Sequence, residues 1–227
     1  MRLLVGCPVS NRNWVLPLWK EHLDEASPVG WEVVPVFVID SSDEQAVEFA
    51  ESWGAIYKLI DEAGYRSRDW DVNRYRHMVA IRNELLKLVR EDDPDLFLSL
   101  DSDILVHPEL ITNLYETLSK NQADAVGGLA YLDQIDPRIT NAAILSSSFF
   151  RRITSVGVSS ADVLMAIKLM TPKAFHVDYQ FHRWGEDFGW SKAARGRGCK
   201  LMFDSRVANK HLMSEYWLDK VDERVGF

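Results

Sequence analysis

Two carboxylates separated by one serine follow an apolar segment directly, in the run Asp101-Ser102-Asp103. Residues 96–100 before them are almost wholly apolar, as expected for a central parallel strand covered on both faces. In an extended chain, side chains i and i+2 share a face, so Asp101 and Asp103 are predicted to reach one cation. Their hard oxygen ligands predict Mg²⁺ or Mn²⁺, with a phosphate as a further partner. The alternative is that both aspartates only shape a turn.

A second apolar segment, residues 32–39, ends in the acidic residue Asp40. Ligands bind at the carboxyl ends of such strands, where a carboxylate accepts hydrogen bonds from a ribose or a base edge. The alternative is that Asp40 and Ser41 cap the next helix, and for Ser41 we favour the cap. The residues alone leave both roles open for Asp40.

Residues 66–77 form the most cationic stretch, with Arg66, Arg68 and Arg76 among aromatic side chains. Guanidinium groups bind phosphate oxygens in a bidentate manner, which favours a phosphate contact in this stretch. A solvated helix face is the alternative explanation.

Glu186 and Asp187 lie among aromatic residues, just before an expected helix at 188–195. Apolar surroundings raise the pKa of a carboxyl group and make it a better general base. The alternative is that the two acids favour the positive end of a helix dipole. Further on, His211 follows an expected strand at 200–203 and could reach back to the metal as a neutral imidazole, although a single histidine is more often structural.

These residues are carried by apolar strands that alternate with amphipathic helices, which predicts an α/β sheet with helices on both faces. Strands are expected at residues 2–7, 32–39, 55–60, 96–100 and 125–131, and helices at 14–26, 43–53, 73–91 and 109–120. Ser41 and Glu44 form a possible capping box for the second helix, and Gly54 stands where that helix would stop. After residue 131 the apolar pieces become shorter, so we expect this half to face the ligand.

Composition is that of an ordinary globular chain of 227 residues, 47% hydrophobic and 26% charged, enough for one domain with a large core. The net charge of −8 argues against indiscriminate binding to nucleic acid or anionic membranes. Cys7 and Cys199 lack metal-ligand spacing, which favours a reducing, cytoplasmic compartment. No stretch approaches the roughly 18 apolar residues that cross a bilayer, so any membrane contact would be peripheral.

In this order, the motifs resemble those of the GT-A glycosyltransferases, especially the family-2-like enzymes that transfer a sugar from a nucleotide diphosphate. The resemblance spans approximately residues 2–211 and is carried by the opening loop Pro8-Val9-Ser10, the acidic turn Ile39-Asp40-Ser41-Ser42-Asp43, the pair Arg82-Asn83, the Asp-x-Asp motif Asp101-Ser102-Asp103, the Glu-Asp motif Gly185-Glu186-Asp187 with Arg195 and Gly198 downstream, and His211. The acidic turn lacks the glycine and the consecutive acids usual in the family.

The resemblance implies a GT-A fold, a Rossmann-like nucleotide-binding mixed sheet flanked by helices, in a single domain over residues 1–227. About 1–106 would form the nucleotide-donor half and 107–227 the acceptor half. The expected donor is a UDP- or GDP-sugar, and the residues expected to bind it are Pro8, Val9, Ser10, Asp40, Arg76, Arg82, Asp101 and Ser102. Mn²⁺ or Mg²⁺ would be held mainly by Asp103, with Asp101 and His211 assisting.

The resemblance also implies an inverting transfer in which Asp187 is the general base and Glu186 orders the acceptor or supports Asp187. The Gln-x-x-Arg-Trp motif of processive synthases is absent, and His182-Arg183-Trp184 precedes the Glu-Asp motif. With no transmembrane segment expected either, a non-processive soluble enzyme is implied. The acceptor stays open among a glycan, a protein side chain, a lipid head group and a modified nucleobase, as does the oligomeric state.

Other functions compete with this interpretation. A nucleotidyltransferase also uses a nucleotide-binding sheet and a carboxylate-held metal, but Gly6 is the single glycine near the first strand, where a glycine-rich phosphate loop is expected. A phosphohydrolase would carry its Asp-x-Asp motif after the first strand rather than about the fourth. A non-catalytic nucleotide-sugar or glycan-binding protein of the same fold is disfavoured by the intact acidic set.

Overall fold

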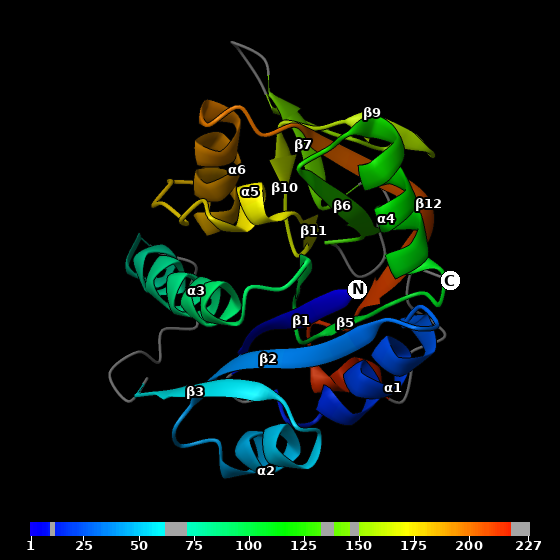
Figure 1. The fold of residues 1–227 in the computed structure, drawn as a ribbon. Coiled ribbons are helices and arrows are strands. Elements are labelled where there is room, and N and C mark those ends of the chain that lie inside the picture. Colours follow the sequence, from blue (N-terminus) through cyan, green and yellow to red (C-terminus); the bar gives the residue numbers. More distant parts are fainter. Residues whose placement is uncertain (10–11, 62–71, 133–138, 146–149, 219–227) are drawn as a thin grey trace.

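A mixed β-sheet runs through both halves of the chain and is covered by helices on its two faces (Figure 1). The computed structural model describes residues 1–9, 12–61, 72–132, 139–145 and 150–218. Ser10, Arg66 and Arg68, which the sequence singled out, lie outside the described residues. Within the described ranges, no helix is long and apolar enough to cross a bilayer.

The bounds of the elements follow chain order. The strands are β1 (Arg2–Val9), β2 (Glu32–Asp40), β3 (Ile56–Ile60), β4 (Leu96–Leu100), β5 (Ile104–Leu105), β6 (Ala125–Ala130), β7 (Ala142–Leu145), β8 (Phe150–Arg152), β9 (Val158–Ser160), β10 (Val163–Leu164), β11 (Ile167–Met170) and β12 (Leu201–His211). The helices are α1 (Leu16–Ala26), α2 (Glu44–Ser52), α3 (Val72–Asp92), α4 (Leu110–Asn121), α5 (Pro172–Phe175) and α6 (Glu186–Gly196).

The described strands of the main sheet are ordered β3-β2-β1-β4-β11-β6-β12-β5, with β9 also paired to β12, and β10-β7-β8 form a separate sheet. The first four strands, β1 to β4, are parallel. Strand β11 is antiparallel to both β4 and β6, and β12 is parallel to β6. The carboxyl ends of β1, β2, β4 and β12 therefore face the same edge of the sheet, where ligands bind in folds of this kind.

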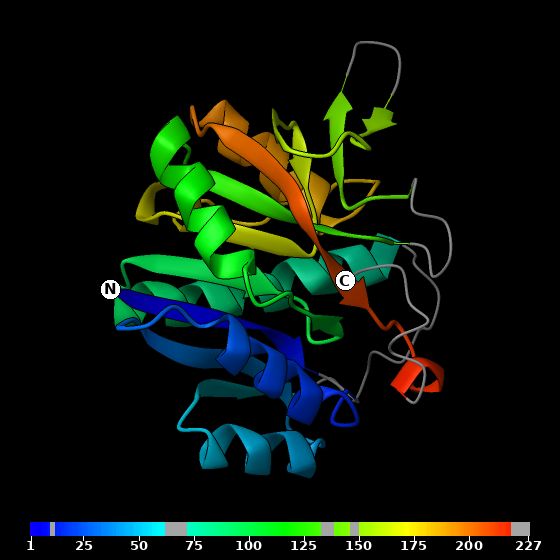
Figure 2. The same cartoon turned by 90° about the vertical axis from the view of Figure 1, so that its right-hand side faces the viewer.

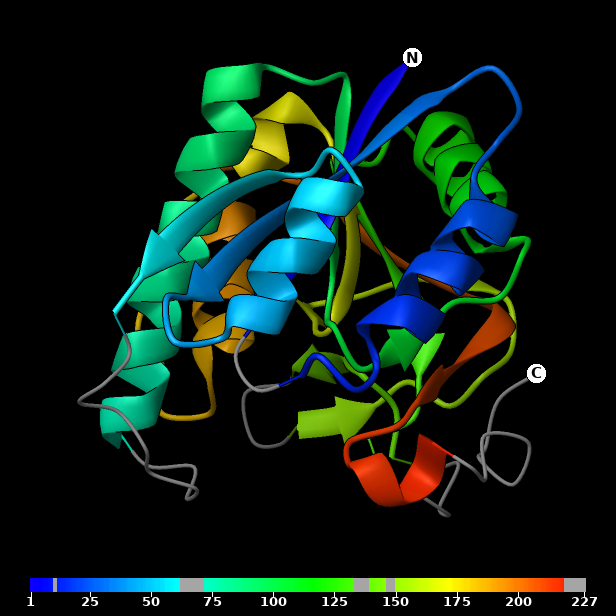
Figure 3. The same ribbon diagram turned by 90° about the horizontal axis from the view of Figure 1, so that it is seen from below.

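Alternating side chains on the strands build a core on each face of the sheet. Leu3 and Val5 of β1 belong to the core that packs under α1, α2 and α4, whereas Leu4 belongs to the core under α3, α5 and α6. This alternation follows from the two-residue period of a strand. Figure 2 shows α1 and α4 on the near side of the sheet, and Figure 3 shows α3 on the opposite side of β1 and β2 from α1.

Most predicted elements are confirmed, with ends that differ by one or two residues. The expected cap at Ser41 is wrong: helix α2 begins at Glu44, and the Asp43 carboxylate accepts the capping hydrogen bond from the Ala46 amide at 3.3 Å. The reason is that the Ser41 amide continues the strand ladder to the Ile60 carbonyl, at 2.8 Å. The predicted stop at Gly54 is confirmed by its φ of +62°.

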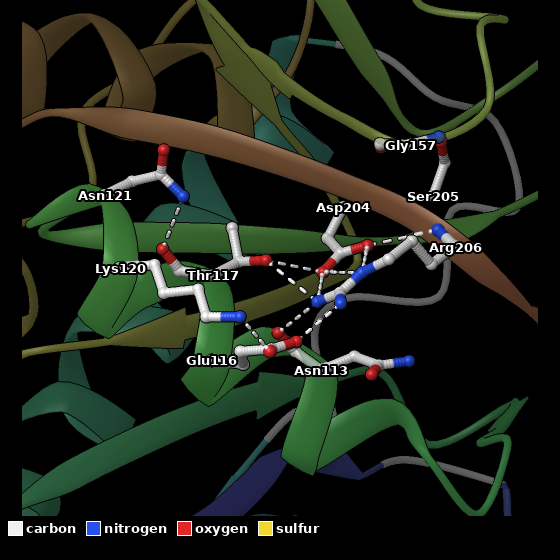
Figure 4. A network of polar contacts seen from close by, with 9 residues as sticks. All are labelled: Asn113, Glu116, Thr117, Lys120, Asn121, Gly157, Asp204, Ser205 and Arg206. Atoms are coloured by element: carbon white, nitrogen blue, oxygen red, sulfur yellow. Dashed lines mark hydrogen bonds and ion pairs between the residues drawn. The ribbon is translucent and has the colours of Figure 1, made fainter.

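Strand β12 is much longer than the predicted strand at 200–203, and a register shift relative to β6 lies between Asp204 and Ala208. At the shift, Arg206 donates to the buried Asp204 carboxylate at 2.7 Å and to the Asn113 carbonyl of α4 at 2.9 Å (Figure 4). The Thr117 hydroxyl of α4 donates to Asp204 at 2.7 Å. This network connects the irregular part of β12 to α4, and the strand continues to His211 at the edge where the parallel strands end.

Candidate active site

The Asp-x-Asp triplet forms a turn rather than the end of a strand. Strand β4 ends at Leu100, and the Ile104 amide donates to the Asp101 carbonyl at 3.1 Å, closing a four-residue turn. The expectation that both carboxylates share one face of an extended chain is therefore wrong. The two side chains have different partners: Asp101 contacts Arg82, and Asp103 contacts His211. Within the described ranges, no group of three or more His, Cys, Asp or Glu side chains is arranged to hold a metal ion.

Asp103 and His211 meet because β5 and β12 are antiparallel neighbours, with His211 opposite Ile104. The Asp103 Oδ1 lies 3.4 Å from the His211 Nε2, and its Oδ2 lies 3.3 Å from the Arg12 Nη2. Burial by itself would raise the pKa of Asp103, but the His211 charge, with help from Arg12, outweighs it and lowers this pKa to about 2. Burial by itself would lower the pKa of His211, but the neighbouring Asp103 carboxylate outweighs this effect and raises the pKa.

The pair Asp103 and His211 fits a divalent cation by the chemistry of its donor atoms. The Nδ1 of His211 lies 3.3 Å from the Tyr131 carbonyl, which orients the ring and directs Nε2 toward Asp103. Metal-binding histidines are commonly oriented by such a backbone contact, and Mn²⁺ accepts both carboxylate oxygen and imidazole nitrogen. Of the three ligands that the resemblance implied, two are thus together, whereas Asp101 faces a guanidinium group.

Arg82 of α3 is 4% exposed and joins two carboxylates that are far apart in the sequence. Its Nη2 donates to the Asp101 Oδ1 at 2.7 Å, and its Nε donates to the Glu186 Oε1 at 3.3 Å. A buried guanidinium group is tolerated when such partners neutralise it. Arg82 therefore links β4 to the start of α6.

Asp187 is paired with Lys168 of β11, which is fully buried. The Lys168 ammonium donates to the Asp187 Oδ1 at 2.6 Å, and the Ala166 amide donates to its Oδ2 at 3.2 Å. Burial alone would raise the pKa of Asp187, but Lys168 and then Arg82 outweigh it and lower this pKa. Burial and the charge of Asp187 raise the pKa of Glu186. The increase in pKa that apolar surroundings predict is thus found at Glu186, whereas the pKa of Asp187 is lowered instead.

Gly185 and Asn83 set how the chain enters α6. Gly185 has a φ of +115°, a conformation that favours glycine, and it lies at the N-cap position of the helix. The Asn83 side chain donates to the Tyr179 carbonyl at 3.1 Å and accepts from the Tyr179 amide at 2.7 Å. Asn83, next to Arg82, therefore anchors residues 177–185, the segment before α6.

The predicted donor-binding residues Pro8, Val9 and Asp40 lie at the carboxyl ends of β1 and β2. The Val9 side chain is buried in the core, so its backbone is the part that a ligand can reach. The Asp40 Oδ1 accepts hydrogen bonds from the amide and the hydroxyl of Ser42, each at 3.0 Å. This local turn uses one oxygen of the carboxylate.

Ser102 and Arg76, also predicted to bind the donor, lie in different surroundings. Ser102 is buried close to the thiol of Cys7, whose pKa is raised by burial. Arg76 is exposed on α3, and its guanidinium carbon lies 5.3 Å from the centre of the Phe181 ring. Arg76 thus borders the segment before α6, whereas Ser102 faces the core.

The sequence interpretation missed Arg12, Lys168 and Tyr179. Lys168 had one local signal, a single charge within an otherwise apolar run at 166–170. A buried lysine needs a partner, so this charge alone predicts a nearby carboxylate. Arg12 and Tyr179 carried no such signal, because their partners come from distant segments.

No family model matches this chain. A "Glycosyltransferase 25 family member" from Drosophila pseudoobscura pseudoobscura is 24% identical over 119 aligned residues, covering 46% of this chain and 19% of that relative. The chain thus matches about a fifth of the relative's length.

Solved structures resemble this chain over most of its length. TarS 1-349 from S. aureus has a TM-score of 0.59 at 13% identity, and the match covers 92% of this chain and 59% of the TarS chain. The complex of TarS 1-349 with UDP-GlcNAc has a TM-score of 0.56 at 15% identity, and the match covers 95% of this chain and 62% of the TarS chain. A197 from STIV has a TM-score of 0.55 at 15% identity and covers 95% of this chain and 87% of its own. The predicted resemblance to glycosyltransferases and the predicted GT-A fold class are thereby confirmed.

Proposed function

We propose that this protein is a nucleotide-sugar glycosyltransferase that moves a sugar from a UDP- or GDP-sugar to an acceptor hydroxyl, with inversion and without processivity. One observation carries the proposal. Five side chains from the turn after β4, the start of α6 and the end of β12 lie at the edge where parallel strands present their carboxyl ends. Asp101 and Glu186 bind Arg82, Asp187 binds Lys168, and Asp103 pairs with His211. Such an edge is where nucleotides bind in related α/β folds.

The donor would lie across the carboxyl ends of β1, β2 and β4. The backbone of Pro8 and Val9 and the carboxylate of Asp40 border this edge, and we assign them to the nucleoside. Arg76 would contact the donor from α3. Ser10 keeps its expected donor-binding role, although it lies outside the described residues. Arg82 and Ser102 keep their predicted donor-binding roles. Arg82 also donates to Asp101, and Ser102 is buried.

A divalent cation, Mn²⁺ or Mg²⁺, would be held by Asp103 and His211, with Asp101 next to them. When bound, it would stabilise the negative charge that develops on the departing nucleoside diphosphate. Asp103 is ionised at neutral pH because its pKa is about 2, as a cation ligand must be. His211 would have to lose its proton to bind the cation, and its raised pKa makes that binding weaker at acidic pH.

Asp187 would act as the general base. An acceptor hydroxyl has a pKa far above neutrality, so its proton must be removed as the oxygen attacks the sugar C1 atom and the bond from C1 to the diphosphate breaks. A positioned base typically contributes about 10²- to 10⁴-fold in rate. Glu186, bound to Arg82, would support Asp187 or order the acceptor.

A thermal-shift screen with UDP-, GDP- and dTDP-sugars, each with and without Mn²⁺, tests donor binding. Ligand at a hundredfold excess over Kd stabilises the native state by about 2.7 kcal/mol, so a true donor will raise the melting temperature clearly. Asp103→Asn should remove the part of the shift that depends on Mn²⁺. Asp24→Asn, an exposed aspartate of α1, is the matched control and should leave the shift unchanged.

Product analysis then tests the reaction. We expect nucleoside diphosphate release with an acceptor present, and we expect Asp187→Asn to abolish transfer while donor binding persists. Release of pyrophosphate would identify a nucleotidyltransferase instead. Donor binding without turnover over a broad acceptor set would indicate a binding protein, and the absence of any shift with every sugar nucleotide would refute the proposal.

A further inference from the structure

Lys168 occupies an unusual place for a lysine. It lies within β11, between β4 and β6 in the sheet, and its side chain is fully buried. Lysines are almost never fully buried without a partner, because the ammonium group loses its hydration. Its carboxylate partner is Asp187, at 2.6 Å.

Two aromatic rings hold the same ammonium group from other directions. The Lys168 Nζ lies 5.5 Å from the centre of the Tyr179 ring and 5.7 Å from the centre of the Trp190 ring. A cation over an aromatic face is attracted by the ring's electrons, most strongly where water is excluded. Tyr179 is fixed in turn by Asn83. The ammonium group therefore has one position, set by β11, α6 and the segment before α6.

The Asp187 carboxylate is held at its second oxygen as well. The Ala166 amide donates to Oδ2 at 3.2 Å, and the Ala166 carbonyl accepts from the Asp101 amide at 3.1 Å. Ala166 has a φ of +62°, a conformation rarely adopted by a residue with a side chain. The backbone of Ala166 thus connects Asp187, through its amide, to the Asp-x-Asp turn, through its carbonyl. Lys168 lies two residues further along the chain.

We infer that Lys168 is a positioning residue for the proton acceptor: its buried ammonium group keeps the Asp187 carboxylate ionised and in one orientation. This inference rests on the proposed function and assigns a role that neither the motifs nor the comparisons give. In the reaction, the acceptor proton moves to Asp187 while the electron pair of the breaking C1–O bond leaves with the diphosphate. Lys168 keeps its proton throughout.

The charges that face Asp187 determine the expected pH dependence. They are Lys168 on β11, Arg82 on α3 and Glu186 on α6. The two cations lower the pKa of Asp187 against the effect of burial. Without Lys168, burial and Glu186 would prevail, so the base would become protonated at a higher pH.

Lys168→Met tests this role, because methionine fills a similar volume without charge. Because Asp187 would lose its fixed orientation, we expect kcat to fall about 10²-fold. The acidic limb of the kcat profile should move to higher pH, and the donor Kd should stay unchanged. Lys168→Arg should restore part of the rate. Lys173→Met is the matched control: Lys173 makes an exposed ion pair with Asp124 at 2.9 Å, and its loss should change neither kcat nor the pH profile.

A measurement independent of turnover completes the test. Carbon-13 NMR titration of the Asp187 carboxyl, assigned with Asp187→Asn, should give a pKa below the ordinary value of about 3.9 in the unaltered protein and a higher one in Lys168→Met. An ordinary or raised pKa in the unaltered protein would overturn the inference, even if Lys168→Met does not fold. Normal transfer with the same acidic limb in Lys168→Met would overturn it too. Absence of transfer by the unaltered protein would instead refute the proposed function.

Discussion

Gly189 provides a direct test of how α6 positions the Glu-Asp pair. A Cβ atom at this residue would lie 1.7 Å from the Gln180 carbonyl oxygen. An ordinary contact between carbon and a carbonyl oxygen is about 3.3 Å, so Gly189→Ala requires a separation of about 1.6 Å between α6 and the segment before it. That segment cannot simply retreat, because Asn83 holds Tyr179 next to Gln180.

The expected cost is worked from two opposing effects. Overpacking costs about 1–3 kcal/mol, and a clash with backbone lies at the upper end of that range. Alanine favours a helix over glycine by about 1 kcal/mol, which leaves a net destabilisation of about 2 kcal/mol. For a chain of this length the melting temperature should fall by about 4–8 °C. Because Asp187 moves with α6, a displacement above 1 Å should also reduce kcat by about 10²-fold.

Calorimetry and transfer kinetics measure the two effects, and the same helix offers a control. A Cβ atom at Gly196 meets nothing within 4 Å, so Gly196→Ala should gain up to about 1 kcal/mol from helix propensity and keep full activity. The reasoning is refuted if Gly189→Ala is as stable and active as the unaltered protein. It also fails if Gly196→Ala loses as much as Gly189→Ala.

Three further predictions concern the buried charges. Arg82→Met leaves the buried Glu186 and the half-buried Asp101 without their cation and should cost about 3–5 kcal/mol in urea denaturation; a loss below 1 kcal/mol would contradict the structure. The ion pair of Asp103 and His211 should stabilise the fold most between about pH 4 and pH 6.5. The lowered pKa of Asp103 removes stability as pH falls from 4 toward 2, and the raised pKa of His211 removes it as pH rises from about 6.5 through that raised value. Asp103→Asn in EDTA should therefore flatten this dependence of the unfolding free energy, and an unchanged curve would count against the pair. Arg206→Ala leaves Asp204 short of its main donor and should cost about 1–3 kcal/mol while transfer kinetics stay normal, since the network lies between β12 and α4; a kinetic defect would contradict this placement.

Local pattern in the sequence determined much of the fold. Segments with a clear local signal, such as β4 and α3, were predicted nearly to their ends, because an apolar run or a helical stripe is present within each segment. The antiparallel strand β11 was missed, because a run of four residues shows no period. The separate sheet of β7, β8 and β10 was missed for the same reason.

The order of motifs in the sequence predicts a donor site at Asp101-Ser102-Asp103, and it placed the Glu-Asp pair next to an expected helix, which is α6. Tertiary structure alone decided which charges meet. The turn after β4 directs Asp101 to Arg82 and Asp103 to His211, and the insertion of β11 beside β4 places Lys168 against Asp187. Residue types and spacing record which groups are available for chemistry, but the partner of a buried charge depends on which strands become neighbours, and that is settled by packing across the whole sheet.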